Sequence, residues 1–296
     1  MTEAKQQTTK ALVLGGGGTT GVAWEMGIIL GLHDGGIDTT DAGLVVGTSA
    51  GSVVGAQITS GLTVEELYAR QLQPLEETKE QVVQFDMNEL FQVLSAGIGA
   101  PDAQTARARV GAAALAVKTM PEEERLEIIT SRLPVQEWPI KQRLVITSVD
   151  AQTGQWVMFD RDAGVALALA VAASCAVPGV YPPVTISGHR YIDGGVRSGT
   201  SADIAKGYQR VLVLRAETLD VSALDPQHST PFMTFEEELA ELEQAGSQVL
   251  VITPNEASAE ARGPNPLDSS RRQSSARAGR EQGRLLAESV RSFWID

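Results

Sequence analysis

The chain has 296 residues, of which 43% are hydrophobic and 21% are charged, and this composition excludes intrinsic disorder over most of its length. Its 37 Asp and Glu residues outnumber its 24 Lys and Arg residues, and the formal net charge of -13 disfavours nucleic acid as a partner. With Cys175 as its single cysteine and only three histidines, the chain cannot form an internal disulfide or a metal site of several thiolates, and we expect a cytoplasmic protein.

The first sixty residues predict two βα units in succession. A polar tail over residues 1–9, which we expect to be disordered, lacks the apolar segment of a signal peptide. The first unit is a strand at Lys10–Leu14 with a helix that ends near Asp34, and the second is a strand at Leu44–Val46 with a helix to about Ser60. Units of this kind place parallel strands side by side, joined by right-handed crossovers.

Residues from about 63 to 139 differ in character and predict a helical insertion. They contain acidic and Gln-rich stretches, such as Glu76–Gln84 and Glu122–Leu133, that read as helices. The sheet then resumes. The strands expected after the insertion are Arg143–Val149, Gln155–Phe159, a hairpin that turns at Gly188 and ends at Asp193, Val211–Leu214 and Val249–Ile252.

Three helices accompany these later strands, at Ala163–Ser174, around Glu236–Gln244 and at Glu281–Trp294. Residues 262–280 are rich in Arg, Ser and Gly, and we expect them to be mobile. The order of elements predicts a single α/β domain over residues 10–296. Its central sheet is expected to be mainly parallel, with helices on both faces in an α/β/α arrangement.

The sequence Gly47-Thr48-Ser49-Ala50-Gly51 fits the pattern G-x-S-x-G and lies between a predicted strand and a predicted helix. A serine in such a turn has a strained backbone, small neighbours and an exposed hydroxyl at a helix start, where the helix dipole favours negative charge. Ser49 is therefore a candidate nucleophile, with Gly47 and Gly51 as the small residues that the turn requires. The alternative is that Ser49 only caps the helix of a glycine-rich turn.

A glycine-rich segment, residues 15–21, lies one βα unit before Ser49. Because adjacent parallel strands end at the same edge of a sheet, its backbone amides could form an oxyanion hole. The candidate residues are Gly16, Gly17 and Gly18. The same segment fits the dinucleotide-binding pattern G-x-G-x-x-G, which also requires an acidic residue at the end of the second strand. The nearby aspartates all precede that strand, so the oxyanion role is favoured.

The base that would activate Ser49 is not fixed by these patterns. A histidine is the usual base for such a serine and should follow it in the chain. His189 and His228 do follow it, but they lie in polar turns, where most histidines are solvated. Asp193 is the other candidate, because it ends a β-prone run before Gly194 and burial could raise its low basicity. A plain Asp-Gly turn is the alternative for Asp193.

Together these pieces resemble the patatin-like phospholipase family over about Lys10–Val213. The resemblance rests on the order of four motifs: the glycine-rich loop, G-x-S-x-G, Ala173-Ser174-Cys175-Ala176-Val177-Pro178, and Asp193-Gly194-Gly195. It implies a patatin-like three-layer α/β/α fold and hydrolysis of lipid acyl esters by a Ser49-Asp193 dyad. It also implies oxyanion amides from Gly16, Gly17 and Gly18, support from Gly47, Gly51 and Gly194, and no metal or organic cofactor.

Thr20 departs from the family pattern, because family members usually have a basic residue at this position. The preference for phospholipids over other esters therefore stays open, as do two other functions: a histidine-based α/β-hydrolase esterase, and a lipid-binding relative without catalysis. A lipid or ester is the expected partner, and the apolar loop Val180–Val184 either contacts a membrane surface transiently or packs onto the sheet. Cys175 is expected to be a packing residue. The sequence makes no prediction of oligomeric state.

Overall fold

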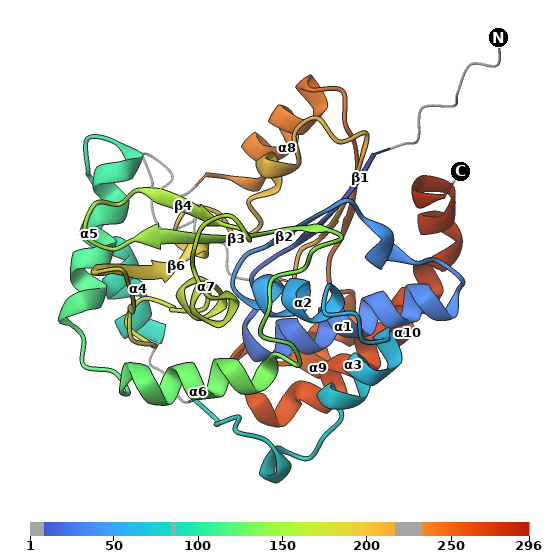
Figure 1. Ribbon diagram of the computed structural model, residues 1–296, viewed down its shortest axis with the longest axis horizontal. Helices are drawn as coiled ribbons and strands as arrows, with labels where there is room; N and C mark the ends of the chain where they lie inside the picture. The colour runs from blue at the N-terminus through green and yellow to red at the C-terminus, as the bar shows by residue number, and fades with distance from the viewer. Residues whose placement is uncertain (1–8, 84–86, 217–232, 296) are drawn as a thin grey trace.

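The computed structural model describes residues 9–83, 87–216 and 233–295, so most of the tail expected over residues 1–9 lies outside the described residues. An eight-stranded sheet runs through the described part of the chain in the order β5-β6-β3-β2-β1-β7-β8, with β4 paired to β3 (Figure 1). The strands are β1 (Lys10–Leu14), β2 (Leu44–Gly47), β3 (Arg143–Asp150), β4 (Trp156–Phe159), β5 (Val184–Ile186), β6 (His189–Asp193), β7 (Arg210–Leu214) and β8 (Gln248–Ile252).

The sheet is mixed. Strands β1, β2, β3, β7 and β8 run parallel, as the βα order predicts, whereas β4 and β6 run antiparallel to β3, and β5 runs antiparallel to β6. Leu14 pairs with Gly47, so the carboxyl ends of β1 and β2 meet at one edge. Asp193, the last residue of β6, pairs with Ser148 of β3, just beyond the β3 residue that pairs with Gly47. The topology therefore brings the ends of β1, β2 and β6 to the same edge.

Helices cover both faces of the sheet, which confirms the predicted α/β/α arrangement (Figure 1). The helices are α1 (Gly18–Asp34), α2 (Ala50–Ile58), α3 (Val64–Gln71), α4 (Met87–Ser95), α5 (Ala103–Ala116), α6 (Glu122–Arg132), α7 (Leu167–Ser174), α8 (Phe235–Gln244), α9 (Glu256–Arg262) and α10 (Arg272–Trp294). Side chains of a strand alternate between faces. On β1, Leu12 and Leu14 enter the core formed with α1, α2, α7 and α10, while Ala11 and Val13 enter the core formed with α8.

Helices α1 and α10 pack backbone against backbone. A side chain added at Gly31 would collide with the carbonyl oxygen of Arg280, and one added at Gly279 would collide with the backbone of Trp24. Across the same contact, the Trp24 indole donates a hydrogen bond of 3.1 Å to Gln282. Glycine allows this close approach because it has no Cβ.

Three helices differ from their predicted bounds. Helix α7 begins at Leu167 instead of Ala163. The described part of Glu76–Gln84 contains only the end of a short 3₁₀ turn, Leu75–Glu77, followed by irregular backbone. Helix α10 begins at Arg272 instead of near Glu281, so it takes in part of the segment 262–280 that was expected to be mobile. Among the helices of the described ranges, none is both long enough and apolar enough to cross a membrane.

Candidate active site

Ser49 lies at a sharp turn between β2 and α2, as the G-x-S-x-G pattern predicts. Its backbone has φ 54° and ψ -116°, a conformation that costs a non-glycine residue about 1–3 kcal/mol. A Cβ at Gly47 would lie 2.6 Å from the carbonyl oxygen of Gly51, and a Cβ at Gly51 would collide with the carbonyl oxygen of Leu14. The turn therefore requires glycine at both positions.

Ser174, the last residue of α7, holds the Ser49 backbone. Its buried hydroxyl accepts a hydrogen bond of 2.9 Å from the amide of Ser49. On the other side of the residue, the Ser49 carbonyl accepts hydrogen bonds from the Ser52 hydroxyl at 2.6 Å and from the Cys175 thiol at 3.2 Å. These contacts fix the main chain around the candidate nucleophile, which is only 9% exposed.

Asp193 is held by the residues that follow Ser174. Its amide donates a hydrogen bond of 3.0 Å to the carbonyl of Ala176, and its Oδ1 accepts one of 2.8 Å from the amide of Gly195. Residues 174–176 therefore contact Ser49 on one side and Asp193 on the other. The sequence pointed to this segment only through the family resemblance, because its small uncharged residues show no chemical role by themselves.

Burial changes the chemistry of the Asp193 carboxyl. It raises the pKa from 3.8 to about 7, against the opposing effects of the Gly195 amide, the Ser49 hydroxyl and the Arg125 guanidinium. The Ser49 hydroxyl lies close enough to the Asp193 carboxyl to lower its pKa. Asp193 Oδ2 nevertheless has no hydrogen bond of normal geometry within the described residues. Near neutral pH the carboxyl is about half protonated, which suits a group that takes and returns a proton.

Gly194 allows β6 to end next to the Ser49 turn. A Cβ at Gly194 would lie 2.7 Å from the carbonyl oxygen of Thr147 on β3. The hydroxyl of Thr147 is in turn 2.8 Å from that of Thr48, the residue before Ser49. Glycine at position 194 therefore lets the end of β6 approach the turn that carries the candidate nucleophile.

The glycine-rich loop contacts the Ser49 turn through a hydrogen bond of 2.9 Å from the Gly51 amide to the Gly15 carbonyl. Gly16 donates its amide to the Gly199 carbonyl at 2.7 Å, so this amide is already engaged within the protein. The loop is therefore fixed both to the turn and to the segment that follows Asp193.

Gly17 and Gly18 lie where the loop enters α1. Gly18 has φ 62°, and a Cβ there would lie 2.5 Å from the carbonyl oxygen of Pro266. The amides at the start of a helix have no partner inside the helix and form a natural anion site. Of the three glycines predicted for an oxyanion hole, Gly17 and Gly18 are the two whose amides lie at this helix start.

Thr20 is buried and brings no charge to the loop, but Arg262 of α9 does. Its Nη2 donates a hydrogen bond of 3.4 Å to the Gly17 carbonyl, and the residue is 3% exposed. Burial raises the pKa of Glu25 on α1 well above its ordinary value, and the nearby Arg262 opposes this rise. Sequence analysis missed this cation because 245 positions separate it from the loop that it contacts.

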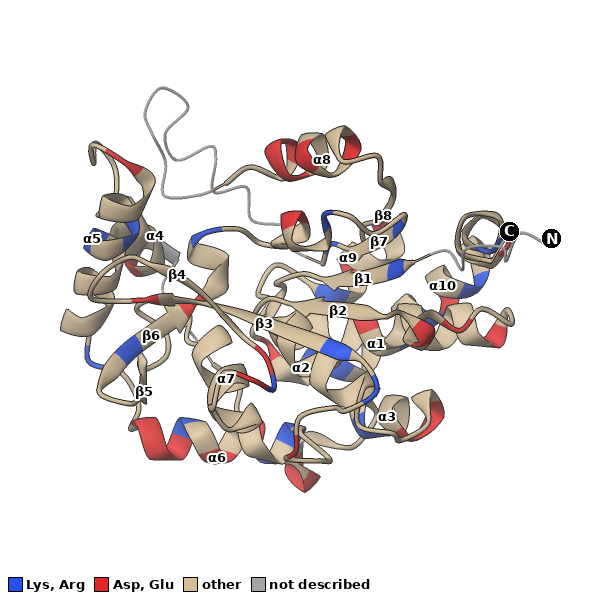
Figure 2. Ribbon diagram, turned by 45° about the horizontal axis from the view of Figure 1, so that its top comes forward, with Lys and Arg blue, Asp and Glu red and all other residues tan. Residues whose placement is uncertain are grey.

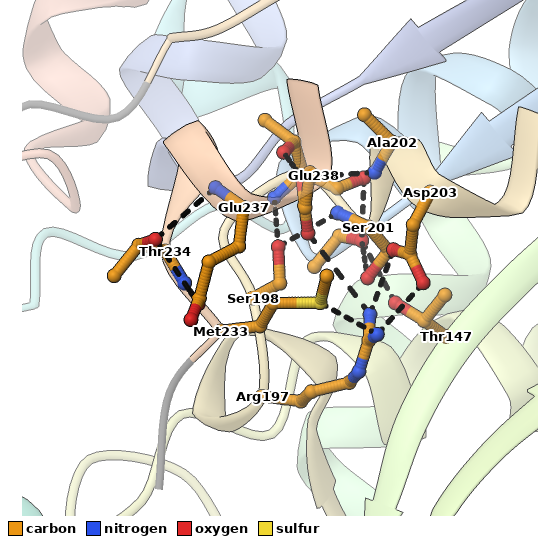
Figure 3. Close-up of polar contacts among 12 residues, drawn as sticks. Thr147, Arg197, Ser198, Ser201, Ala202, Asp203, Met233, Thr234, Glu237 and Glu238 are labelled. Carbon is orange, nitrogen blue, oxygen red and sulfur yellow. Dashed lines mark hydrogen bonds and ion pairs between the residues drawn. The ribbon is translucent and has the colours of Figure 1, made fainter. Parts of the chain in front are cut away.

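A buried carboxylate on α8 anchors the segment that follows Asp193 (Figure 3). Glu238 is fully buried and accepts hydrogen bonds from the Thr200 hydroxyl and, at 3.0 Å, from the Ala202 amide. Arg197 closes the cluster with hydrogen bonds of 2.9 and 2.7 Å to the carboxylate of Asp203. No motif in the sequence indicated Glu238 as part of the site.

The anchored segment reaches both loops of the candidate site. Its Gly199 carbonyl accepts the Gly16 amide, and its Thr200 carbonyl accepts the Thr48 hydroxyl at 3.4 Å. Helix α8 therefore supports the glycine-rich loop and the Ser49 turn through a few connected hydrogen bonds.

The histidines do not meet Ser49 in the described contacts. His189 Nδ1 lies 2.9 Å from Oδ2 of Asp150, and His33 on α1 lies 3.4 Å from Glu65. The alternative base His228 falls outside the described residues. Cys175 is buried, and burial raises the pKa of its thiol, which keeps it protonated and favours the predicted packing role.

Two further features bear on ligands. Within the described ranges, no group of three or more His, Cys, Asp and Glu residues is arranged to hold a metal ion. In the loop Val180–Val184, Tyr181 and Val184 are 4% and 3% exposed, and the Tyr181 ring centre lies 3.5 Å from the Arg125 guanidinium. These two side chains therefore pack against the protein.

Comparison with known proteins gives one family and several solved structures. The model of the family described as "Patatin-like phospholipase" matches residues 12–206. VipD from Legionella pneumophila has 13% identity and a TM-score of 0.43, with 96% of this chain and 67% of that chain covered. The type III effector ExoU has 14% identity and a TM-score of 0.39, with 95% and 53% covered.

ExoU in complex with SpcU from Pseudomonas aeruginosa has 16% identity and a TM-score of 0.39, with 98% and 53% covered, so this chain spans about half the length of ExoU. No curated protein sequence matches the chain. The family match takes in more than half of the chain, from β1 to the residue after the 3₁₀ turn Ala202–Ala205, and so includes both Ser49 and Asp193. The motif order therefore predicted correctly that this protein belongs to the patatin-like phospholipase family.

Proposed function

We propose that this protein hydrolyses acyl esters of lipids, with Ser49 as the nucleophile and Asp193 as the base. One observation carries the proposal: a buried carboxyl with a pKa of about 7 lies close to a hydroxyl on a strained turn. An aspartate at its ordinary pKa of 3.8 would bind the serine proton too weakly at neutral pH. Membership of the family supports a lipid ester as the substrate.

The reaction would proceed through an acyl-enzyme. Ser49 Oγ attacks the ester carbonyl carbon while Asp193 takes the hydroxyl proton. The bond from that carbon to the alcohol oxygen breaks, the alcohol leaves with the proton from Asp193, and the acyl group stays on Ser49. Water then gives a proton to Asp193 and attacks the acyl group, and the fatty acid leaves as Ser49 regains its proton.

The negative charge of each tetrahedral intermediate needs hydrogen-bond donors. We assign this role to the amides of Gly17 and Gly18, because they lie at the start of α1, where the helix dipole favours an anion. Gly16 has a different part: its bond to Gly199 fixes the loop. The start of α2, directly after Ser49, adds a second helix dipole of the same sense.

The dyad is tested by hydrolysis of p-nitrophenyl esters of graded chain length. Ser49→Ala and Asp193→Asn should each lower kcat/KM by at least about a thousandfold, because each removes a group that acts in the chemical step. Asp162→Asn, an exposed aspartate, is the matched control and should keep full activity. Unchanged activity in both dyad variants would exclude the mechanism.

The histidine-based alternative makes the opposite prediction for His189. Because His189 contacts Asp150, His189→Ala should keep its activity if Asp193 is the base. Labelling of Ser49 by a fluorophosphonate would argue against a lipid-binding relative without catalysis. The single cysteine supports a cytoplasmic location, from which the enzyme would reach lipid by transient contact with a membrane surface.

A further inference from the structure

A pocket of about 420 Å³ lies next to the glycine-rich loop, between the ends of α3 and α6 and the start of α10. It is separate from Ser49 but shares the first turn of α1 with the candidate site, through Thr19 and Val22. The charged residues of its lining are Arg70, Glu76, Glu77, Lys79, Glu80, Arg132 and Arg272.

The buried part of this lining holds more positive than negative charge. Arg132 donates two hydrogen bonds of 2.8 Å to the carboxylate of Glu80, and both side chains are at most 10% exposed. Arg272, the first residue of α10, is 6% exposed and donates one hydrogen bond of 2.8 Å to the Arg70 carbonyl. Arg70 is partly buried and donates to the Ser131 carbonyl at 3.0 Å. Two buried guanidinium groups and a partly buried one therefore line the pocket beside a single buried carboxylate.

The remaining charges of the pocket do not remove this excess. Lys79 is exposed and paired with Glu127 at 2.9 Å, and Glu76 and Glu77 are exposed to solvent, where water screens their charge. The pKa of Arg272 is lowered as a result. Burial is the main cause, and the neighbouring guanidiniums of Arg132 and Arg70 lower the pKa further, while the carboxylate of Glu80 opposes the change. Like charges held together in this way need a counterion.

The excess stands out against the rest of the molecule. The net charge of the chain is -13, and acidic residues mark outer surfaces such as α8 and the start of α6 (Figure 2). The end of α6, by contrast, carries Arg132 into the pocket. A second buried guanidinium on α6, that of Arg125, lowers the pKa of Asp193 and is itself affected by Arg132. The cationic region therefore extends from the pocket toward the candidate active site.

We propose that this pocket binds a phosphate group through Arg70, Arg132 and Arg272. The planar guanidinium presents paired N–H donors that match phosphate oxygens, and a phosphate with two negative charges would balance three guanidiniums and one carboxylate. The Thr19 hydroxyl lies at the start of α1, where the helix dipole adds to the attraction. This proposal rests on the proposed function, in which the phosphate belongs to the headgroup of a lipid whose acyl ester lies at Ser49. Free phosphate is the other source.

The binding experiment needs no turnover, so it stands whether or not Ser49 is the nucleophile. Inorganic phosphate is titrated into the full chain by calorimetry, with Arg70→Gln, Arg272→Gln and the control Arg277→Gln, an exposed arginine on the same helix. We expect binding to the wild type and the control, and affinity at least about tenfold lower in the other two variants. Thermal unfolding checks that each variant is folded, and Arg70→Gln, at a partly buried position, is the less disruptive change.

A kinetic experiment then distinguishes the two sources of phosphate. The substrates are a lysophospholipid and a monoacylglycerol with the same acyl chain. If the pocket holds the headgroup, Arg70→Gln and Arg272→Gln lower kcat/KM about tenfold for the lysophospholipid and leave the monoacylglycerol unchanged. If the two variants have the same effect on kcat/KM for both substrates, and the wild type binds phosphate, the pocket is assigned to free phosphate. The proposal is overturned if the wild type does not bind inorganic phosphate, or if all variants bind it with the same affinity.

Discussion

The burial of Asp193 has opposite consequences for catalysis and for stability. The folded protein keeps the carboxyl proton until about pH 7, whereas the unfolded chain releases it near pH 3.8. The stability that the neutral carboxyl contributes is fully present below about pH 4, and it is lost as the pH rises through about 7. Above that pH the buried charge destabilises the fold by up to about 4 kcal/mol, the same change that makes the carboxylate a stronger base.

Asp193→Asn should therefore stabilise the protein in a pH-dependent way. The amide carries no charge at any pH, so the variant should unfold at a higher temperature than the wild type at pH 8 and at a similar temperature at pH 4. The measurement is thermal unfolding across this range. Ser49→Ala is the matched control and should keep a loss of stability with rising pH, because it leaves the carboxyl in place and removes only a hydroxyl that lowers the carboxyl pKa. A difference between Asp193→Asn and wild type that does not vary with pH would contradict the assignment.

Sequence reasoning indicated Ser49 and Asp193 as candidates because each lies in a short motif whose geometry is local, although for Asp193 the motif left the histidines open as alternative bases. A strand, a tight glycine turn and a helix place a serine with few alternatives. The residues that hold this pair in place could not be recognised in the same way. Ser174 acts through its hydroxyl and Ala176 through its main-chain carbonyl, and groups of these kinds occur throughout any protein. Arg125 acts on the pKa of Asp193, and Arg262 contacts the glycine-rich loop. Both are far from their partners in the sequence, so the spacing of residues cannot predict these contacts.

At the scale of elements, α8 links the far face of the sheet to the candidate site. Its Glu238 holds the segment that accepts hydrogen bonds from Gly16 and Thr48. The helix begins with a capping box between Thr234 and Glu237, which fixes where its first turn starts. Glu238 directly follows Glu237, so the capping box also fixes the position of Glu238 in the first turn of the helix.

Removal of the Glu238 carboxylate should loosen the glycine-rich loop and the Ser49 turn together. Glu238→Ala should lower kcat about tenfold with little change in KM, because in the proposed mechanism the loops meet the reacting carbonyl and not the acyl chain. Glu238→Gln keeps an oxygen that can accept from Thr200 and Ala202, so it should retain most of the activity. Steady-state kinetics well below the unfolding temperature make this comparison.

The control for this experiment lies on the same helix. The Glu241 side chain is 46% exposed and paired with Lys206 at 3.6 Å, and Glu241→Ala should leave kcat unchanged. A loss of the same size in Glu238→Ala and Glu241→Ala would show that α8 acts only through general stability.

Strands were easier to predict than helices because the core strands are continuous apolar runs bounded by polar or glycine residues. Two helical errors have physical causes. The stretch Glu76–Gln84 has helix-forming residues, yet Arg132 holds Glu80 in an irregular segment. The first half of α10 buries Ser275, Ala276 and Gly279, so its inward face is small and polar and shows no apolar period.

At the scale of the whole molecule, the closing helix completes the face of the sheet that carries the candidate site. Helix α10 lies beyond the residues matched by the family, yet it packs closely against α1 from Trp24 to Gly31. The contact depends on glycines in both helices, among them Gly31 and Gly279. The helix that follows the glycine-rich loop is therefore positioned from the far end of the sequence.

Gly31→Ala should destabilise the fold by about 2–3 kcal/mol, even though alanine is the better helix former, because its Cβ meets the Arg280 carbonyl. Gly43→Ala is the matched control: its Cβ would have ordinary contacts of 3.8 Å and longer, and its unfolding temperature should stay near that of the wild type. Denaturant unfolding gives both free energies. Equal stability of the two variants would mean that α1 and α10 can separate without loss.

The same contact bears on how the molecule is made. In the order of synthesis Trp24 leaves the ribosome 258 residues before its hydrogen-bond partner Gln282. Until then the apolar side of α1 has no helix to cover it, and the glycine amides at its tip have no settled position. The nascent chain should thus acquire a settled glycine-rich loop only after α10 has left the ribosome, because α1 lacks its main packing partner before that point.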